Sequence, residues 1–178
     1  RGLGDVYKRQ DLYQVPRICF VNKMDRIGAS YDRTVEMIRE RLGANPIRVQ
    51  MPVGQESSFQ GVIDLLEEVF ILWTDDLGAA PEHMPIPEEL REEAAARRAE
   101  MIEAIAETDE ALTDKYLGGE QITVEELKAA LRRAVIAGKA TPVFLGSALK
   151  NKGIQPLLDG VVEYLPSPLD IPDVAGIK

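Results

Sequence analysis

The chain has 178 residues, 45% of them hydrophobic, with a formal net charge of −9 and a sequence pI of about 4.8. This length fits one α/β domain, or a smaller core that carries an inserted module. The acidic balance argues against direct nucleic-acid binding, and no apolar run approaches the length of a membrane span. A single cysteine, Cys19, allows no disulfide within the chain, which is typical of the reducing cytoplasm.

The first ten residues do not fit the pattern that follows them. Residues 5–10 resemble the translated end of a sequencing adapter joined to an incomplete reading frame. We therefore expect residues 1–10 to be a non-native leader, with the protein proper beginning near Asp11; a genuine terminus is the alternative.

A short apolar run at 17–21 predicts a buried strand of a parallel sheet, and it ends at Asn22-Lys23-Met24-Asp25. In open α/β sheets, ligands bind beyond the carboxyl ends of the strands. The pattern Asn-Lys-x-Asp is similar to the guanine-reading motif of GTP-binding proteins. The Asp25 carboxylate can accept from both the ring N–H and the exocyclic amine of guanine. Asn22 can bond the other base edge or tie the loop together, and the stem of Lys23 can lie along the base. The alternative is a polar turn that caps the next helix.

The next elements carry local start and stop signals. Ser30 and Gly43 bound a predicted helix over 31–42. Alternating apolar residues then predict strands over 47–53, 59–63 and 69–73.

An acid-rich helix is predicted over 88–106. Six glutamates crowd its outer side: Glu88, Glu89, Glu92, Glu93, Glu100 and Glu103. This face is either a solvated helix surface or a docking surface for a basic partner. Further helices are predicted over 109–117 and over 124–137, where Thr123 and Glu126 form a capping box.

A second buried strand, 141–145, ends at Gly146-Ser147-Ala148-Leu149. In GTP-binding domains the companion guanine loop carries Ser-Ala after the next parallel strand. By that resemblance the Ala148 N–H donates to the guanine carbonyl oxygen, Ser147 braces Asp25, and Leu149 packs near the base. A last helix is predicted over 154–164, with Ile154, Leu157, Leu158, Val161 and Val162 facing inward. The prolines beyond it predict a stiff linker, 166–178, to a further domain.

Roughly a hundred residues separate the two loops, too many for a connection without structure of its own. We therefore expect an inserted α+β subdomain at 43–139, acting as an accessory module outside the guanine site. Residues 11–42 and 140–165 then form the guanine-reading half of a GTP-binding domain. The expected fold class is α/β: the C-terminal half of a P-loop-GTPase-type parallel sheet domain that carries this insertion.

Several longer segments resemble the bacterial elongation factor G family. They are residues 22–29 (Asn-Lys-Met-Asp-Arg-Ile-Gly-Ala), 41–44, 115–117, 146–153 and 164–168. The resemblance implies a cytoplasmic translational GTPase that binds GTP/GDP with Mg²⁺ and drives tRNA and mRNA through the ribosome. It also implies the ribosomal stalk protein as a partner of the inserted subdomain.

The phosphate-binding pattern Gly-x-x-x-x-Gly-Lys-Ser/Thr does not occur in the 178 residues. We therefore expect a fragment whose parent protein is a GTPase but which does not hydrolyse GTP by itself, and which contains neither catalytic residues nor metal ligands. Two alternatives stay open: a release-factor or ribosome-protection GTPase with the same insertion, and a non-catalytic acidic interaction module.

Overall fold

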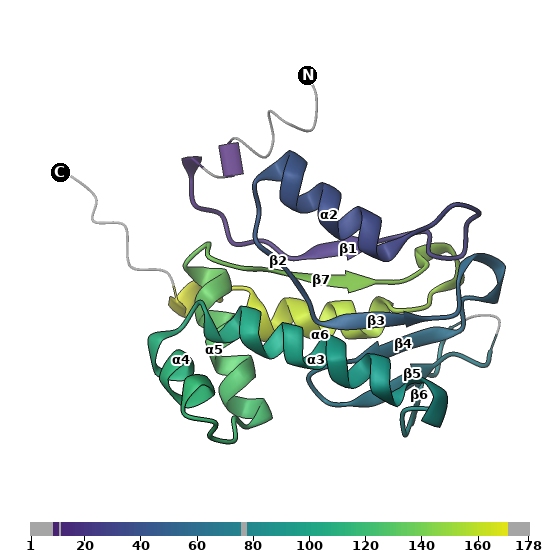
Figure 1. Ribbon diagram of the computed structural model, residues 1–178. Coiled ribbons are helices and arrows are strands. Elements are labelled where there is room, and N and C mark those ends of the chain that lie inside the picture. The colour runs from purple at the N-terminus through teal and green to yellow at the C-terminus, as the bar shows by residue number, and fades with distance from the viewer. Residues whose placement is uncertain (1–8, 11, 76–77, 171–178) are drawn as a thin grey trace.

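The computed structural model describes residues 9–10, 12–75 and 78–170 (Figure 1). Residues 1–8 of the expected leader and 171–178 of the expected linker lie outside the described residues. Within the described residues, no helix has the length and the apolar character needed to cross a membrane.

The described strands form two sheets, and helices pack around both of them. The strands are β1 (Cys19–Val21), β2 (Pro46–Arg48), β3 (Gln50–Val53), β4 (Gly61–Asp64), β5 (Val69–Leu72), β6 (Glu82–Met84) and β7 (Thr141–Leu145). The α-helices are α2 (Tyr31–Leu42), α3 (Arg91–Ala106), α4 (Glu110–Leu117), α5 (Val124–Ile136) and α6 (Ile154–Tyr164). Short 3₁₀ turns are η1 (Glu56–Ser58), η2 (Glu88–Leu90), η3 (Ala148–Lys150) and η4 (Pro168–Asp170).

The three-stranded sheet is parallel, with the order β1-β7-β2 (Figure 1). Its register pairs Val21 with Leu145, the last residues of β1 and β7. The two loops that follow these strands therefore start side by side at the carboxyl edge of the sheet, where α/β proteins bind ligands. The expected fold class is confirmed.

The single strand expected over 47–53 is two strands in two different sheets. β2 pairs with β7, whereas β3 opens the antiparallel sheet β3-β4-β5-β6. The pairing of Arg48 with Val143 would place residue 50 opposite Leu145 if β2 continued. The chain turns away instead, and the buried side chain of Gln50 takes over the missing backbone contact: its Oε1 accepts from the Leu145 N–H at 3.2 Å. Local alternation along 47–53 carries no signal for this change of sheet.

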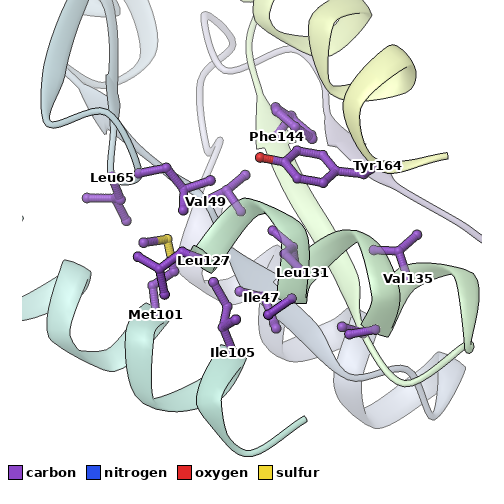
Figure 2. Packing of buried hydrophobic residues seen from close by; sticks show 14 of the residues in the cluster. Ile47, Val49, Leu65, Met101, Ile105, Leu127, Leu131, Val135, Phe144 and Tyr164 are labelled. Atoms are coloured by element: carbon purple, nitrogen blue, oxygen red, sulfur yellow. The ribbon is translucent and has the colours of Figure 1, made fainter. Parts of the chain in front are cut away.

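Successive residues of β7 face opposite sides of the parallel sheet, as strand geometry requires. Val143 and Leu145 pack in one cluster with Tyr31 and Val35 of α2. Phe144 packs in the other cluster, with side chains from α3, α5 and α6. Figure 2 shows this second cluster, in which Phe144 and Tyr164 lie close together above α5.

Both clusters continue into the antiparallel sheet. Neighbouring residues of β4, Val62 and Ile63, belong to different clusters, as do Ile71 and Phe70 of β5. The segment 43–139 thus shares its two cores with the rest of the chain, and it also contributes β2 to the parallel sheet. The division into domains by sequence stays a proposal.

Helix ends follow the expected local signals. The Ser30 side chain accepts from the Arg33 N–H, Gly43 ends α2 in the left-handed region, and Thr123 and Glu126 form the complete capping box of α5.

The inward face expected for the last helix is wrong in part. Leu158 and Val162 are 58% and 81% exposed, and Val161 is also exposed. The buried residues of α6 are Gly160 and Tyr164. The helix packs on Phe144 at Gly160. The approach is so close that a Cβ at position 160 would lie 2.3 Å from Cζ of Phe144. The contact face is therefore set by the Phe144 ring, which helical periodicity alone does not reveal.

Candidate functional site

The site is built where the two loops leave β1 and β7, and backbone hydrogen bonds join these loops. The Gly146 N–H donates to the Val21 carbonyl at 3.0 Å, and the Met24 N–H donates to the Gly146 carbonyl at 3.0 Å. Met24 is buried beneath its loop, 2% exposed. Backbone hydrogen bonds alone therefore hold the first loop against the second.

The Asn22 side chain adds a bridge between the loops. Its Oδ1 accepts from the Lys23 N–H at 2.7 Å and from the Ala148 N–H at 2.9 Å. These bonds tie the two loops together, and a role of Asn22 at the base edge stays a prediction. The Ala148 N–H, which the resemblance assigns to guanine, donates to Asn22 here. Lys23 adopts a left-handed backbone (φ 65°), a conformation that is uncommon for a residue other than glycine.

Asp25 is the anionic group of the site. It is partly exposed and, with Arg26 and Ile27, lines a hollow of about 450 Å³. The hydroxyl of Ser147 is the main influence that lowers the pKa of Asp25, and the charges of Lys150 and Arg26 act in the same direction. Ser147 Oγ is buried and makes no hydrogen bond of ordinary geometry among the described residues. Asp25 is therefore an ionised two-oxygen acceptor at neutral pH.

The second loop is a tight turn. Ser147 and Lys152 exchange backbone hydrogen bonds at 2.9 and 3.0 Å. Gly146 has no room for a side chain, because a Cβ there would lie 2.3 Å from the Lys152 carbonyl oxygen. The turn leaves Ala148 and Leu149 exposed, Leu149 at 80%.

The structure thus brings four of the six predicted site residues together. Asn22 bonds Ala148, and Ser147 acts on Asp25. Lys23 and Leu149 are exposed, and the Lys23 N–H donates to the side chain of Asn22.

Sequence reasoning missed the residues of the insertion that contact both loops. Glu56 Oε1 accepts from the N–H of Gly28, at the end of the first loop, at 2.7 Å. The Gly78 carbonyl accepts from the side chains of Asn151 and Gln155, which follow the second loop, at 3.2 and 2.9 Å. No local motif marks these residues, since their partners are 28 to 77 positions away. The segment 43–139 thus contacts residues that flank the two loops, and its expected place outside the guanine site stays a prediction.

A metal site is not formed by the part of the chain that the structure describes. No group of three or more His, Cys, Asp or Glu residues in it can hold a metal ion.

Comparison with known proteins identifies the class. Residues 5–167 match the family of the elongation factor Tu GTP-binding domain, and the chain belongs to this family. It is 56% identical to elongation factor G of Thermotoga maritima over 171 residues, and 54% identical to elongation factor G of Thermotoga neapolitana. Each match covers 96% of this chain and 25% of the relative, so the chain spans about a quarter of the proteins it matches. The resemblance seen in the sequence is confirmed.

A solved structure agrees with this assignment. A crystal structure of a protein from Thermus thermophilus superposes with a TM-score of 0.81 at 32% identity. The match covers 93% of this chain and 24% of the other.

Proposed function

We propose that this chain carries the guanine-reading half of a translational GTPase of the elongation factor G type, which binds GTP and GDP and promotes movement of tRNA and mRNA through the ribosome. One observation carries the proposal: an ionised Asp25 faces a hollow at the carboxyl edge of a parallel sheet, beside a second loop tied to its own by Asn22. The family match and the elongation factor G relatives support it.

The proposed roles follow from donor and acceptor chemistry. Asp25 accepts from the ring N–H and the amine of guanine, a pair of donors that adenine does not offer. Ser147 braces Asp25, and Asn22 holds the second loop in place. Ala148 turns its N–H from Asn22 towards the guanine carbonyl, or shares it between the two acceptors. Lys23 and Leu149 cover the base faces.

The phosphate chemistry lies elsewhere in this proposal. GTP supplies the phosphoanhydride bond and Mg²⁺ balances its charge in the parent protein, whereas this chain binds and orients the base. We assign residues 11–42 and 140–165 to this half, 43–139 to the insertion and 166–178 to a link, in a cytoplasmic protein that works on the ribosome without direct nucleic-acid or membrane binding by this segment.

Base selectivity tests the proposal. We would prepare a chimera in which this chain replaces the matching quarter of Thermotoga maritima elongation factor G, and titrate it with labelled GDP against unlabelled GDP and ADP. We expect GDP to compete and ADP to fail by at least about a thousandfold, because Asp25 finds no donor pair on adenine. Equal competition would overturn the assignment and leave the acidic interaction module as the better description.

The exposed acidic side of η2 and α3 supports a protein partner with a basic surface, and the family resemblance suggests the ribosomal stalk as that partner. Glu92 and Glu103 are exposed, and Glu88 is 82% exposed although it pairs with Arg91. Replacing all three with Lys in the chimera should slow ribosome-stimulated GTP turnover by about tenfold while leaving the affinity for GDP unchanged, because charge patches act mainly on association. Ribosome-stimulated rates equal to those of the unmodified chimera would show that this helix face is merely solvated.

A further inference from the structure

We propose that Glu56 and Gln155 are positioning residues of the guanine site, through which the insertion controls how long a guanine nucleotide stays bound. The inference rests on the proposed function and adds that the lifetime of the bound nucleotide depends on the insertion. It starts from contacts at three points, each at the end of a loop or strand that builds the site.

The first contact fixes the end of the Asn22–Asp25 loop. Gly28 follows Asp25 by three residues, and its N–H donates to Glu56 Oε1 at 2.7 Å while its carbonyl accepts from Arg33 at 2.7 Å. A carboxylate acceptor makes the first bond charge-assisted. Glu56 itself has a left-handed backbone (φ 51°), a conformation that a residue other than glycine keeps only when its surroundings hold it.

The second contact fixes the end of the Ser147–Ala148 loop. Gln155 donates from Nε2 to the Gly78 carbonyl at 2.9 Å and accepts from the Trp73 indole N–H at 3.2 Å. Asn151 donates to the same carbonyl at 3.2 Å. Position 78 must be glycine, because a Cβ would lie 2.6 Å from the Lys150 carbonyl oxygen. The insertion backbone therefore packs directly on the backbone of the second loop.

The third contact is the bond from Gln50 to the Leu145 N–H, which fixes the end of β7 one residue before the turn. Together the three contacts hold both loops against one body. The loops are joined to each other by the bond of 2.9 Å between Ala148 and Asn22. Removing the contact of Glu56 or that of Gln155 should therefore increase the motion of Asp25 relative to Ala148. A binding site whose groups are held less firmly loses its ligand faster.

The experiment compares matched variants of the chimera described above. Glu56→Ala removes the acceptor for Gly28, whereas Glu56→Gln keeps an acceptor oxygen. Gln155→Ala removes both bonds of Gln155, whereas Gln155→Glu keeps the acceptor for Trp73 and loses the donor to Gly78. Glu40→Ala, on the exposed side of α2, is the control.

We expect GDP to dissociate about tenfold faster from Glu56→Ala, Gln155→Ala and Gln155→Glu, because each loses a hydrogen bond that positions a loop. Glu56→Gln should remain within about twofold of the unmodified chimera, and Glu40→Ala should not differ from it. Single-turnover hydrolysis of bound GTP should be unchanged in all of them, since none of these residues contacts the phosphates in the proposal.

The outcomes separate the two levels of the argument. If the unmodified chimera does not select GDP over ADP, the proposed function fails. If it does, and both alanine variants release GDP at the unmodified rate, the positioning role is wrong while the guanine assignment stands. If Gln155→Ala lowers the melting temperature, the comparison of Glu56→Ala with Glu56→Gln tests the positioning role instead. This contact lies at the surface, because Gly28 is exposed and Glu56 is only partly buried. Amide exchange in the 178-residue chain adds a direct readout: Glu56→Ala must expose the Gly28 N–H, and continued protection would overturn the inference.

Discussion

At the scale of single residues, Asp32 links the helix that follows the first loop to the acidic helix. Arg97 of α3 donates to both of its carboxylate oxygens, at 2.9 and 3.1 Å, and Arg48 lies 3.3 Å away. Arg97 also binds Glu93 on its own helix. The hydrogen bond from Arg97 is the main cause that lowers the pKa of Asp32 below its ordinary value of 3.8. Folding therefore stabilises the ionised form of the Asp32 carboxylate.

This direction predicts how stability depends on pH. A lowered pKa contributes stability that is present above the ordinary value and is lost as the pH falls through the folded-state pKa. Asp32→Asn should cost about 1 kcal/mol or less at pH 7, since Asp32 is half-exposed and water screens the pair. The cost should be smaller at about pH 3 than at pH 7, because below the ordinary value of 3.8 the carboxylate of the unfolded chain is already largely protonated and the contribution is being lost.

Urea unfolding at both pH values measures this, with Asp159→Asn, exposed on α6, as the control. A cost for Asp32→Asn that is the same at pH 7 and at pH 3 would mean that the ionised pair contributes nothing.

At the scale of elements, the sequence predicted what depends on neighbours along the chain. The capped helices α2 and α5 lie where Ser30, Gly43 and Thr123 place them, because caps act within one turn. The adjacency of the loops after β1 and β7 was also predictable, since parallel strands end at the same edge. The change of sheet at Val49, the docking face of α6 and the contacts of Glu56 and Gly78 depend on partners far along the chain. Periodicity and motifs contain no information on such pairs.

The glycine in α6 offers a test of its docking face. In an exposed helix Gly→Ala is favourable by about 1 kcal/mol. At Gly160 the new Cβ meets the Phe144 ring, and overpacking costs about 1–3 kcal/mol. Gly160→Ala should therefore lower the free energy of unfolding by about 1 kcal/mol, whereas Leu158→Ala, at an exposed position, should change it by less than about 0.5 kcal/mol. Chemical denaturation of the two variants decides, and the reverse order would contradict the packing of Phe144 on this helix.

At the scale of the whole molecule, segment 43–139 and the rest of the described chain share their hydrophobic cores. Both hydrophobic clusters cross from the parallel sheet into the antiparallel sheet. Lys128 of α5 pairs with Glu67 and with Glu163 of α6, which adds a polar tie between the two parts.

The sequence as a whole predicts that the 178-residue chain does not hydrolyse GTP. Catalysis of phosphoryl transfer depends on groups that hold the phosphates and their metal ion, and the glycine-rich phosphate loop does not occur in this sequence. Phosphate release from GTP should stay at the buffer rate with and without Mg²⁺, measured next to the chimera as a positive control. Magnesium-dependent release by highly purified chain would contradict this.

The most direct test of the guanine assignment is the exchange of one oxygen for one nitrogen in the chimera, Asp25→Asn. The change replaces an acceptor by a donor that meets the guanine amine, and sites built to pair one polar group reject its mismatch by roughly 10⁴ or more. Xanthine carries a carbonyl where guanine carries that amine. We therefore predict that GTP affinity falls by several orders of magnitude and that xanthosine triphosphate binds in its place. If Asp25 only caps a turn, the variant loses about 1 kcal/mol of stability and keeps its base preference. Competition titration of the folded variant with both nucleotides gives the answer, and an unchanged preference for GTP would contradict the account.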